Sequence, residues 1–63
     1  MKLRDFLNLI GGGEYVRMCD GNVNNIVYEA DKNAIRMHYA DLLDREIFKI
    51  GILFKNTFEV LIK

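Results

Sequence analysis

Cys19, His38 and Asp41 carry the side chains that a nucleophile, a general base and an orienting carboxylate would need. Asp41 follows His38 by about one helical turn, but nothing in the spacing connects either residue to Cys19. A cysteine at the end of a strand is more often a small buried apolar group. A histidine between Met37 and Tyr39 is more often at the surface. We therefore predict no catalytic residues and a protein that is not an enzyme.

Gly11–Gly13 is the segment that could be taken for a phosphate-binding loop. Such loops follow a strand and lead into the N-terminus of a helix, where backbone amides converge on the anion. Here the glycines follow the apolar stripe of a helix, whose C-terminal carbonyl groups repel anions. We predict that they end that helix through a left-handed cap.

Four carboxylates could be oxygen ligands of a metal ion: Asp31, Asp41, Asp44 and Glu46. Their spacing lacks the central glycine of a calcium-binding loop. One cysteine and one histidine cannot complete a four-ligand zinc site. We predict that the carboxylates cap helices or lie in a solvated turn, and that the protein has no metal and no cofactor.

The first half of the chain predicts a helix followed by a hairpin. The helix has apolar residues at i, i+3, i+4 and i+7, namely Leu3, Phe6, Leu7 and Ile10. Two runs rich in branched and aromatic residues, 15–19 and 26–30, then flank a polar loop. The register that makes one face of the hairpin apolar pairs Met18 with Ile26 and Val16 with Tyr28.

The second half predicts an irregular helix and a second hairpin. Asp31 can cap a helix over residues 33–44, although the imperfect stripe leaves a broken helix or a 3₁₀ segment open. Alternating apolar residues then indicate two strands. A three-residue loop with Asn56 in the left-handed conformation gives their register, which pairs Ile52 with Phe58, Ile50 with Val60 and Phe48 with Ile62.

These elements predict one α+β domain over residues 1–63, in the order α-β-β-α-β-β. We expect a small four-stranded antiparallel sheet packed on one N-terminal helix, with a short, irregular second helix. The first helix should cover one sheet face, formed by Val16, Met18, Ile26, Tyr28, Ile50, Ile52, Val60 and Ile62. The opposite face carries Tyr15, Val27, Ile47, Leu53 and Leu61 among the charged residues Arg17, Glu29, Lys49 and Glu59. Because that face is too apolar for water alone, the second helix or another protein must cover it.

The composition points in the same direction. A chain of 63 residues and 7.4 kDa forms a small core, and its single cysteine allows no internal disulfide, so tight packing or a partner must supply stability. An apolar content of 51% excludes a disordered tail. Nine basic residues balance nine acidic ones without long runs, which disfavours nucleic-acid binding. The longest apolar run, Ile50–Phe54, is too short to cross a membrane, and the lone thiol fits a cytoplasmic protein.

Four segments resemble a group of tiny uncharacterised proteins from phages and mobile elements of Gram-positive bacteria: Met1–Leu7, Val16–Asp20, Ile26–Ala30 and Leu42–Ile47. The shared features are the start of the chain, a strand ending in Asp, a strand with Tyr, and a leucine-rich stretch that runs into Asp-Arg-Glu. Small proteins of such origin are frequently inhibitors of host defence, CRISPR systems included. The resemblance therefore implies an anti-defence protein that occludes a surface of its target.

We predict a non-enzymatic protein-binding module that docks on a host protein, or on itself, by steric occlusion in the bacterial cytoplasm. The expected contact residues are Tyr15, Arg17, Val27, Glu29, Ile47, Lys49, Leu53, Glu59 and Leu61. One alternative is a homo-oligomeric small-molecule or nucleotide binder whose pocket forms between subunits. Another is a nucleic-acid-associated accessory protein.

Overall fold

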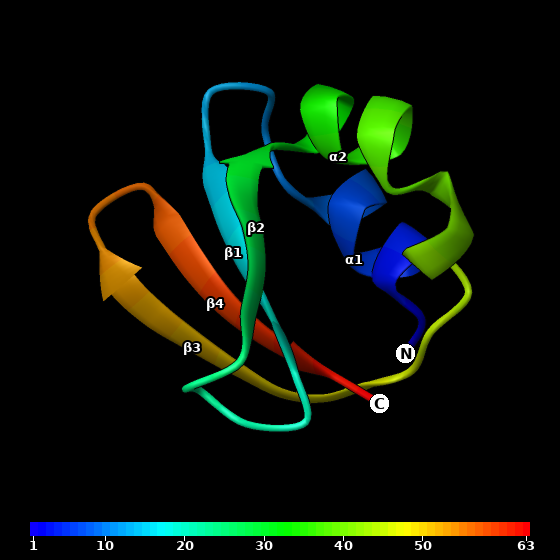
Figure 1. The fold of residues 1–63 in the computed structure, drawn as a ribbon. Coiled ribbons are helices and arrows are strands. Elements are labelled where there is room, and N and C mark those ends of the chain that lie inside the picture. The colour runs from blue at the N-terminus through cyan, green and yellow to red at the C-terminus, as the bar shows by residue number, and fades with distance from the viewer.

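Two hairpins and two short helices make up the structure, a computed structural model that describes all 63 residues (Figure 1). In chain order the elements are α1 (Leu3–Leu9), β1 (Tyr15–Asp20), β2 (Ile26–Asp31), α2 (Lys32–His38), the 3₁₀ turn η1 (Ala40–Leu42), β3 (Ile47–Phe54) and β4 (Thr57–Ile62). The predicted α+β class and element order are confirmed. None of the helices has the length and apolar character needed to cross a membrane.

The four strands form one mixed sheet in the order β2-β1-β4-β3. Each hairpin is antiparallel, but the central strands β1 and β4 run parallel to each other, so the prediction of an antiparallel sheet was wrong on this point. The reason is the connection between the hairpins. The segment that contains α2 and η1 carries the chain back across the sheet, so that β3 starts at the same end as β2, as in a helical crossover (Figure 1).

The helix α1 buries the predicted stripe of Leu3, Phe6, Leu7 and Ile10. Its end differs from the prediction. Ile10 adopts an extended conformation, with φ −99° and ψ 158°, and none of Gly11–Gly13 has a positive φ, so there is no left-handed glycine cap. The extended backbone at Ile10 stops the helix while its side chain remains in the core.

The second helix is broken, as the imperfect stripe allowed. Asp31 caps α2, because its Oδ1 accepts a hydrogen bond of 2.8 Å from the amide of Ala34. The helix ends at His38, and Tyr39, with φ −132° and ψ 40°, separates it from η1. Ile35 is the one residue of α2 that is fully buried.

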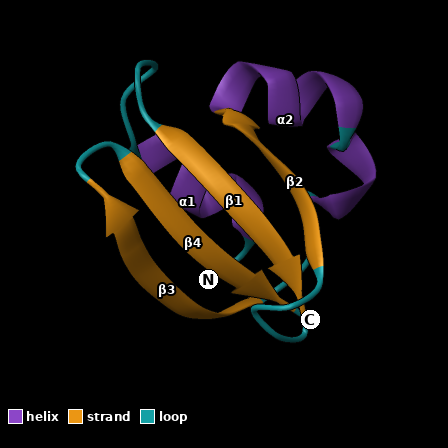
Figure 2. Cartoon of the chain, turned by 60° about the vertical axis from the view of Figure 1, so that its left-hand side comes forward, coloured by secondary structure: helices purple, strands orange, loops and turns teal.

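Both helices pack on the same side of the sheet. The core cluster joins α1 and α2 to β1 and β4 and consists of Leu3, Phe6, Leu7, Ile10, Val16, Met18, Ile35, Val60 and Ile62. Figure 2 shows α1 behind β1 and β4, with α2 beyond β2. The second face of the sheet therefore has no helix over it, and neither does the strand β3.

The registers of both hairpins differ in detail from the predicted ones. In the first hairpin, Met18 pairs with Tyr28 instead of Ile26. The shift is of two residues, so Met18 and Tyr28 lie on the same face of the sheet, as predicted. In the second, Ile52 with Phe58 and Ile50 with Val60 are confirmed.

The turn and the far end of the second hairpin do not follow the prediction. Phe54 pairs with Thr57, which leaves a two-residue turn, and Asn56 does not have a positive φ. Ile62 pairs with Ile47 because a bulge makes Phe48 an extra residue of β3.

Candidate functional site

The outer edge of β3 is the open backbone edge that stands out in this fold. β3 lies at one side of the sheet and is its longest strand, with eight residues. Only its start is paired on the outside, where the amide of Ile47 donates to the carbonyl of Met1 at 2.8 Å and Lys2 bridges to Glu46. From Phe48 to Phe54 no other strand covers this edge.

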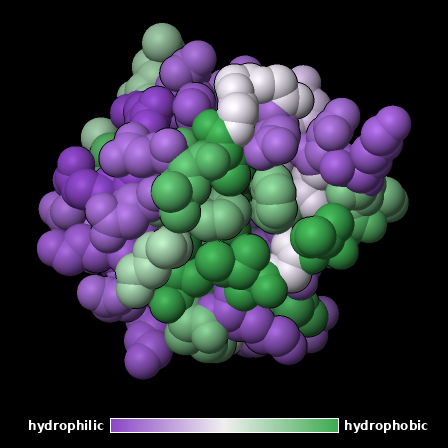
Figure 3. Space-filling view, turned by 180° about the vertical axis from the view of Figure 1, so that it is seen from behind, coloured by the Kyte–Doolittle hydropathy of each residue, from purple (hydrophilic) through white to green (hydrophobic).

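Four large apolar side chains of this strand are exposed. The exposed fractions are 46% for Phe48, 44% for Ile50, 76% for Ile52 and 67% for Phe54. We call these four residues the β3 edge patch. In Figure 3, the molecule seen from behind, apolar side chains form a band across the face and extend toward the side on which β3 lies. A protein with about half of its residues apolar thus leaves one strand largely unburied.

The exposure of Ile50 and Ile52 corrects the prediction that the first helix covers them. A seven-residue helix is only about 10 Å long, whereas the axes of four strands span about 14 Å. The core therefore lies over β1 and β4, and β3 contributes no fully buried residue. The mismatch between a short helix and a four-stranded sheet was the signal in the sequence that could have revealed this patch.

Ile26 was also predicted beneath the first helix, and it is 54% exposed. It pairs with Cys19 because a bulge in the first hairpin leaves Val27 as the extra residue. Val27 itself packs against the core cluster and not on the open face. Ile47 makes the same change of face, because the bulge at Phe48 reverses the alternation and pairs Ile47 with the buried Ile62.

The remaining predicted contact residues lie mostly on the helix-free face. Arg17 and Glu29 form an ion pair there, with Nε and Oε1 2.5 Å apart. Glu59 lies between Arg17 and Gly51 in the register, and Tyr15 at the start of β1 is 52% exposed.

Cys19 and Leu61 are neighbours in the register of β1 and β4, and both are buried outside the core cluster. Lys49 pairs with Leu61 from the side of β3, and Leu53 is the partly buried extra residue of a second bulge in that strand. The apolar centre of the helix-free face, formed by Cys19 and Leu61, is thus buried within the single chain. The exposed apolar surface is concentrated on β3 instead.

The candidate catalytic side chains are not brought together. Cys19 belongs to the helix-free face, where burial raises the pKa of its thiol. His38 lies on the other side of the sheet, with its ring centroid 6.3 Å from that of Tyr28, a residue that packs against the core. Asp41 is exposed in η1. These three residues do not form a nucleophile, base and carboxylate.

Three of the four candidate metal ligands are separately engaged, and the fourth, Asp41, is exposed in η1. Asp31 caps α2, and Asp44 accepts a hydrogen bond of 2.8 Å from Nε of Arg4, which lowers the pKa of the carboxyl group. Glu46 contacts the N-terminal ammonium of Met1. No three histidine, cysteine or acidic side chains gather in a metal-binding arrangement. The chain also encloses no ligand-sized pocket, so the small-molecule alternative needs a pocket between subunits.

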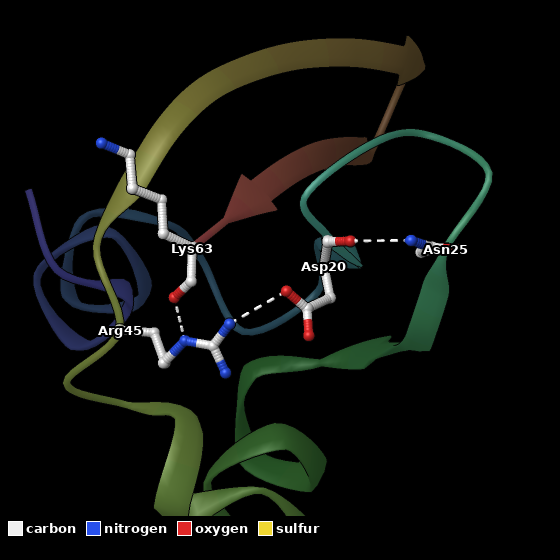
Figure 4. Close-up of polar contacts among 4 residues, drawn as sticks. All are labelled: Asp20, Asn25, Arg45 and Lys63. Carbon is white, nitrogen blue, oxygen red and sulfur yellow. Dashed lines mark hydrogen bonds and ion pairs between the residues drawn. The ribbon is translucent and has the colours of Figure 1, made fainter.

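Arg45 positions the start of β3. Its Nη2 donates to Oδ1 of Asp20 at 2.9 Å, and its Nε donates to the backbone carbonyl of Lys63 (Figure 4). Asn25 donates to the carbonyl of Asp20 from the loop of the first hairpin at 3.1 Å. These contacts join the ends of β1 and β4 to the segment that leads into β3, so the edge strand is held at its first residues.

Fold and surface together define a small α+β domain without an enclosed site, whose most unusual feature is an open, apolar strand edge. No protein-family model, no curated protein and no solved structure matches the chain. The function must therefore be argued from the surface.

Proposed function

We propose that this chain is a non-enzymatic protein-binding module whose binding element is the edge of β3. The observation that supports this proposal is the unpaired outer edge of β3 from Phe48 to Phe54, flanked by the exposed side chains of the β3 edge patch. A free edge offers amide and carbonyl groups to a further strand. Recognition by strand addition draws affinity from these groups and specificity from the alternating side chains.

The size of the patch fits a binding surface. From their exposed fractions, the four residues present about 450 Å² of mostly apolar surface along the edge, with Phe54 on the face opposite Ile52, which is about half of the ~800 Å² that each partner contributes to a standard interface. The largest apolar patch on a typical monomer is about 300–600 Å² and is often functional. Lys49 and Glu59, on the helix-free side of the same hairpin, would supply a charged rim.

The target class comes from the resemblance to small phage proteins. On that basis we propose a bacterial host protein of the cytoplasm as the target, blocked by steric occlusion when β3 docks on it. A free strand edge with apolar side chains binds an extended segment that is itself partly apolar, so we expect the target to present such a segment. An anti-defence role follows from the resemblance alone.

Affinity capture from a Gram-positive bacterial lysate tests this proposal. Three baits are compared: the wild-type chain, Ile52→Lys and Met37→Lys. Ile52 and Met37 are matched, since both are 76% exposed, but Met37 lies on α2. We expect a partner that wild type and M37K retain and I52K loses. Equal capture by I52K and wild type refutes β3 as the binding element, and no capture by any bait refutes a host target.

A further inference from the structure

We infer that the strand which adds to β3 is β3 of a second copy of this chain, paired antiparallel about a two-fold axis through Gly51. The inference rests on the proposed function, because it uses the same edge, which the second copy covers when no host segment is bound to it. A closed two-fold contact is the commonest arrangement of homo-oligomers, and it buries the same patch on both subunits.

The alternation of side chains limits the possible centres. With the axis perpendicular to the sheet, the helix-bearing sides of both copies lie together, so facing residues must belong to the same side of the pleat. Between its two bulges β3 is regular from Lys49 to Ile52, which leaves Ile50, Gly51 and Ile52 as centres for an apolar contact. Centring on Gly51 places Ile50 of each copy opposite Ile52 of the other, and β-branched pairs of this kind stabilise a sheet.

The positive charges of the lysine side chains distinguish among these three possible positions of the two-fold axis. Centring on Ile50 makes the two copies of Lys49 diagonal neighbours about 7 Å apart, and like charges at such positions are destabilising. Centring on Ile52 brings Lys49 next to Lys55 of the second copy. With Gly51 at the axis the two copies of Lys49 lie about 14 Å apart along the strands, and each faces Leu53 instead. The Gly51 register therefore avoids both repulsions.

Gly51 itself is otherwise unexplained in the single chain. A Cβ added at this position would meet nothing within 4 Å, and the residue does not have a positive φ. The fold of one copy therefore does not require glycine, although glycine in a strand weakens it. Glycine inside a strand often marks the close approach of another backbone. At the two-fold axis, two glycines leave no side chains facing each other on the helix-free side of the paired strands.

Area and net charge agree with a dimer. The two edge patches together expose about 900 Å², and strand pairing covers only the parts of these side chains that face the second copy, so the contact stays below the ~1,200 Å² of standard interfaces and is that of a weak, reversible dimer. The chain has a formal net charge of zero, so two copies do not repel each other as a whole.

Disulfide trapping tests the register. Gly51→Cys and Lys49→Cys place a thiol on the same side of the same strand. At the axis the two Cα atoms of residue 51 would lie about 4.5–5.5 Å apart, which a disulfide spans, whereas those of residue 49 would not be within reach. Under mild oxidation we expect G51C to form a covalent dimer at least tenfold faster than K49C. The wild type is the control, because its one cysteine, Cys19, is buried, and it should form no covalent dimer. Equal rates, or a faster K49C, overturn the Gly51 register.

Sedimentation velocity of the pure wild type tests the occupant. We expect a concentration-dependent dimer, with a dissociation constant at least 100-fold weaker for I52K and unchanged for M37K. A wild type that stays monomeric at 500 μM overturns the second copy as the occupant. That failure is distinguishable from failure of the proposed function, because a monomer that still captures a host protein through Ile52 loses only this inference.

Discussion

Replacing Ile52 and Ile62 by alanine compares two isoleucines of one hairpin that differ in burial. Ile52 is 76% exposed, so only about 45 Å² of its surface is covered in the single chain, which corresponds to about 1 kcal/mol at most. Ile62 is fully buried in the core cluster, and removal of such a side chain costs about 2–5 kcal/mol. A chain of this length has a free energy of unfolding of about 3–9 kcal/mol, so the second loss is a large fraction of the total.

Urea unfolding followed by circular dichroism at about 5 μM protein measures both effects on the single chain. We expect Ile52→Ala to lower the free energy of unfolding by less than about 1 kcal/mol and Ile62→Ala by 2 kcal/mol or more. If I62A does not fold, Ile62→Val, with an expected loss of about 0.5–1.5 kcal/mol, replaces it. A loss above 2 kcal/mol for I52A at this concentration would show that the chain itself buries Ile52, and would refute the description of the β3 edge.

Three further predictions concern the helices and their caps. Ile35→Ala should lower the free energy of unfolding by about 2–5 kcal/mol in urea titrations, because Ile35 is the buried anchor of α2, and a loss below 1 kcal/mol would place α2 outside the core. Asp31→Ala should cost about 1 kcal/mol through the lost cap on Ala34, and a neutral result would contradict the cap. For Asp44, the hydrogen bond from Arg4 lowers the carboxyl pKa in the folded state, so its contribution to stability is complete above about pH 4 and is lost as the pH falls through the lowered pKa. NMR titration of wild type against Arg4→Ala should show the Asp44 pKa rising in the variant, and no change would contradict the ion pair.

The sequence predicted local elements well, because each depends on residues close together in the chain. The apolar stripe of α1 and the cap at Asp31 are local signals, and both are present. The alternation in the second hairpin placed Ile50 and Ile52 opposite their correct partners on β4. These features follow from helical and strand periodicity alone.

Features that depend on one extra residue or on the path of a connection were not predictable in the same way. A single bulge at Phe48 moved Ile47 to the core, and a bulge in the first hairpin removed Val27 from the predicted face. Alternation carries no signal for such an insertion. The parallel pairing of β1 with β4 depends on where the segment around α2 returns the chain, which no residue pattern specifies. The exposed edge of β3, by contrast, follows from the shortness of α1, for which the sequence did carry a signal.

The exposed apolar surface is therefore largest on a different part of the sheet from the one expected from the sequence. Its predicted centre on the helix-free face is partly closed, since Leu61 is buried beside Cys19. The underlying physical expectation, that two short helices cannot cover all the apolar surface of this chain, agrees with the exposed β3 edge patch. That patch includes Ile50 and Ile52, which the sequence had assigned to the covered side.

Amide hydrogen exchange along β3, followed by NMR, tests most directly whether this edge is open to a partner strand. In dilute protein, the amides of residues 48–54 that point away from β4 should exchange rapidly, while those bonded to β4 are protected. At several hundred micromolar the outward amides should become protected as the second copy pairs with them. Protection of the outward amides that is already complete in dilute solution would mean that the chain covers its own edge, and would contradict the account.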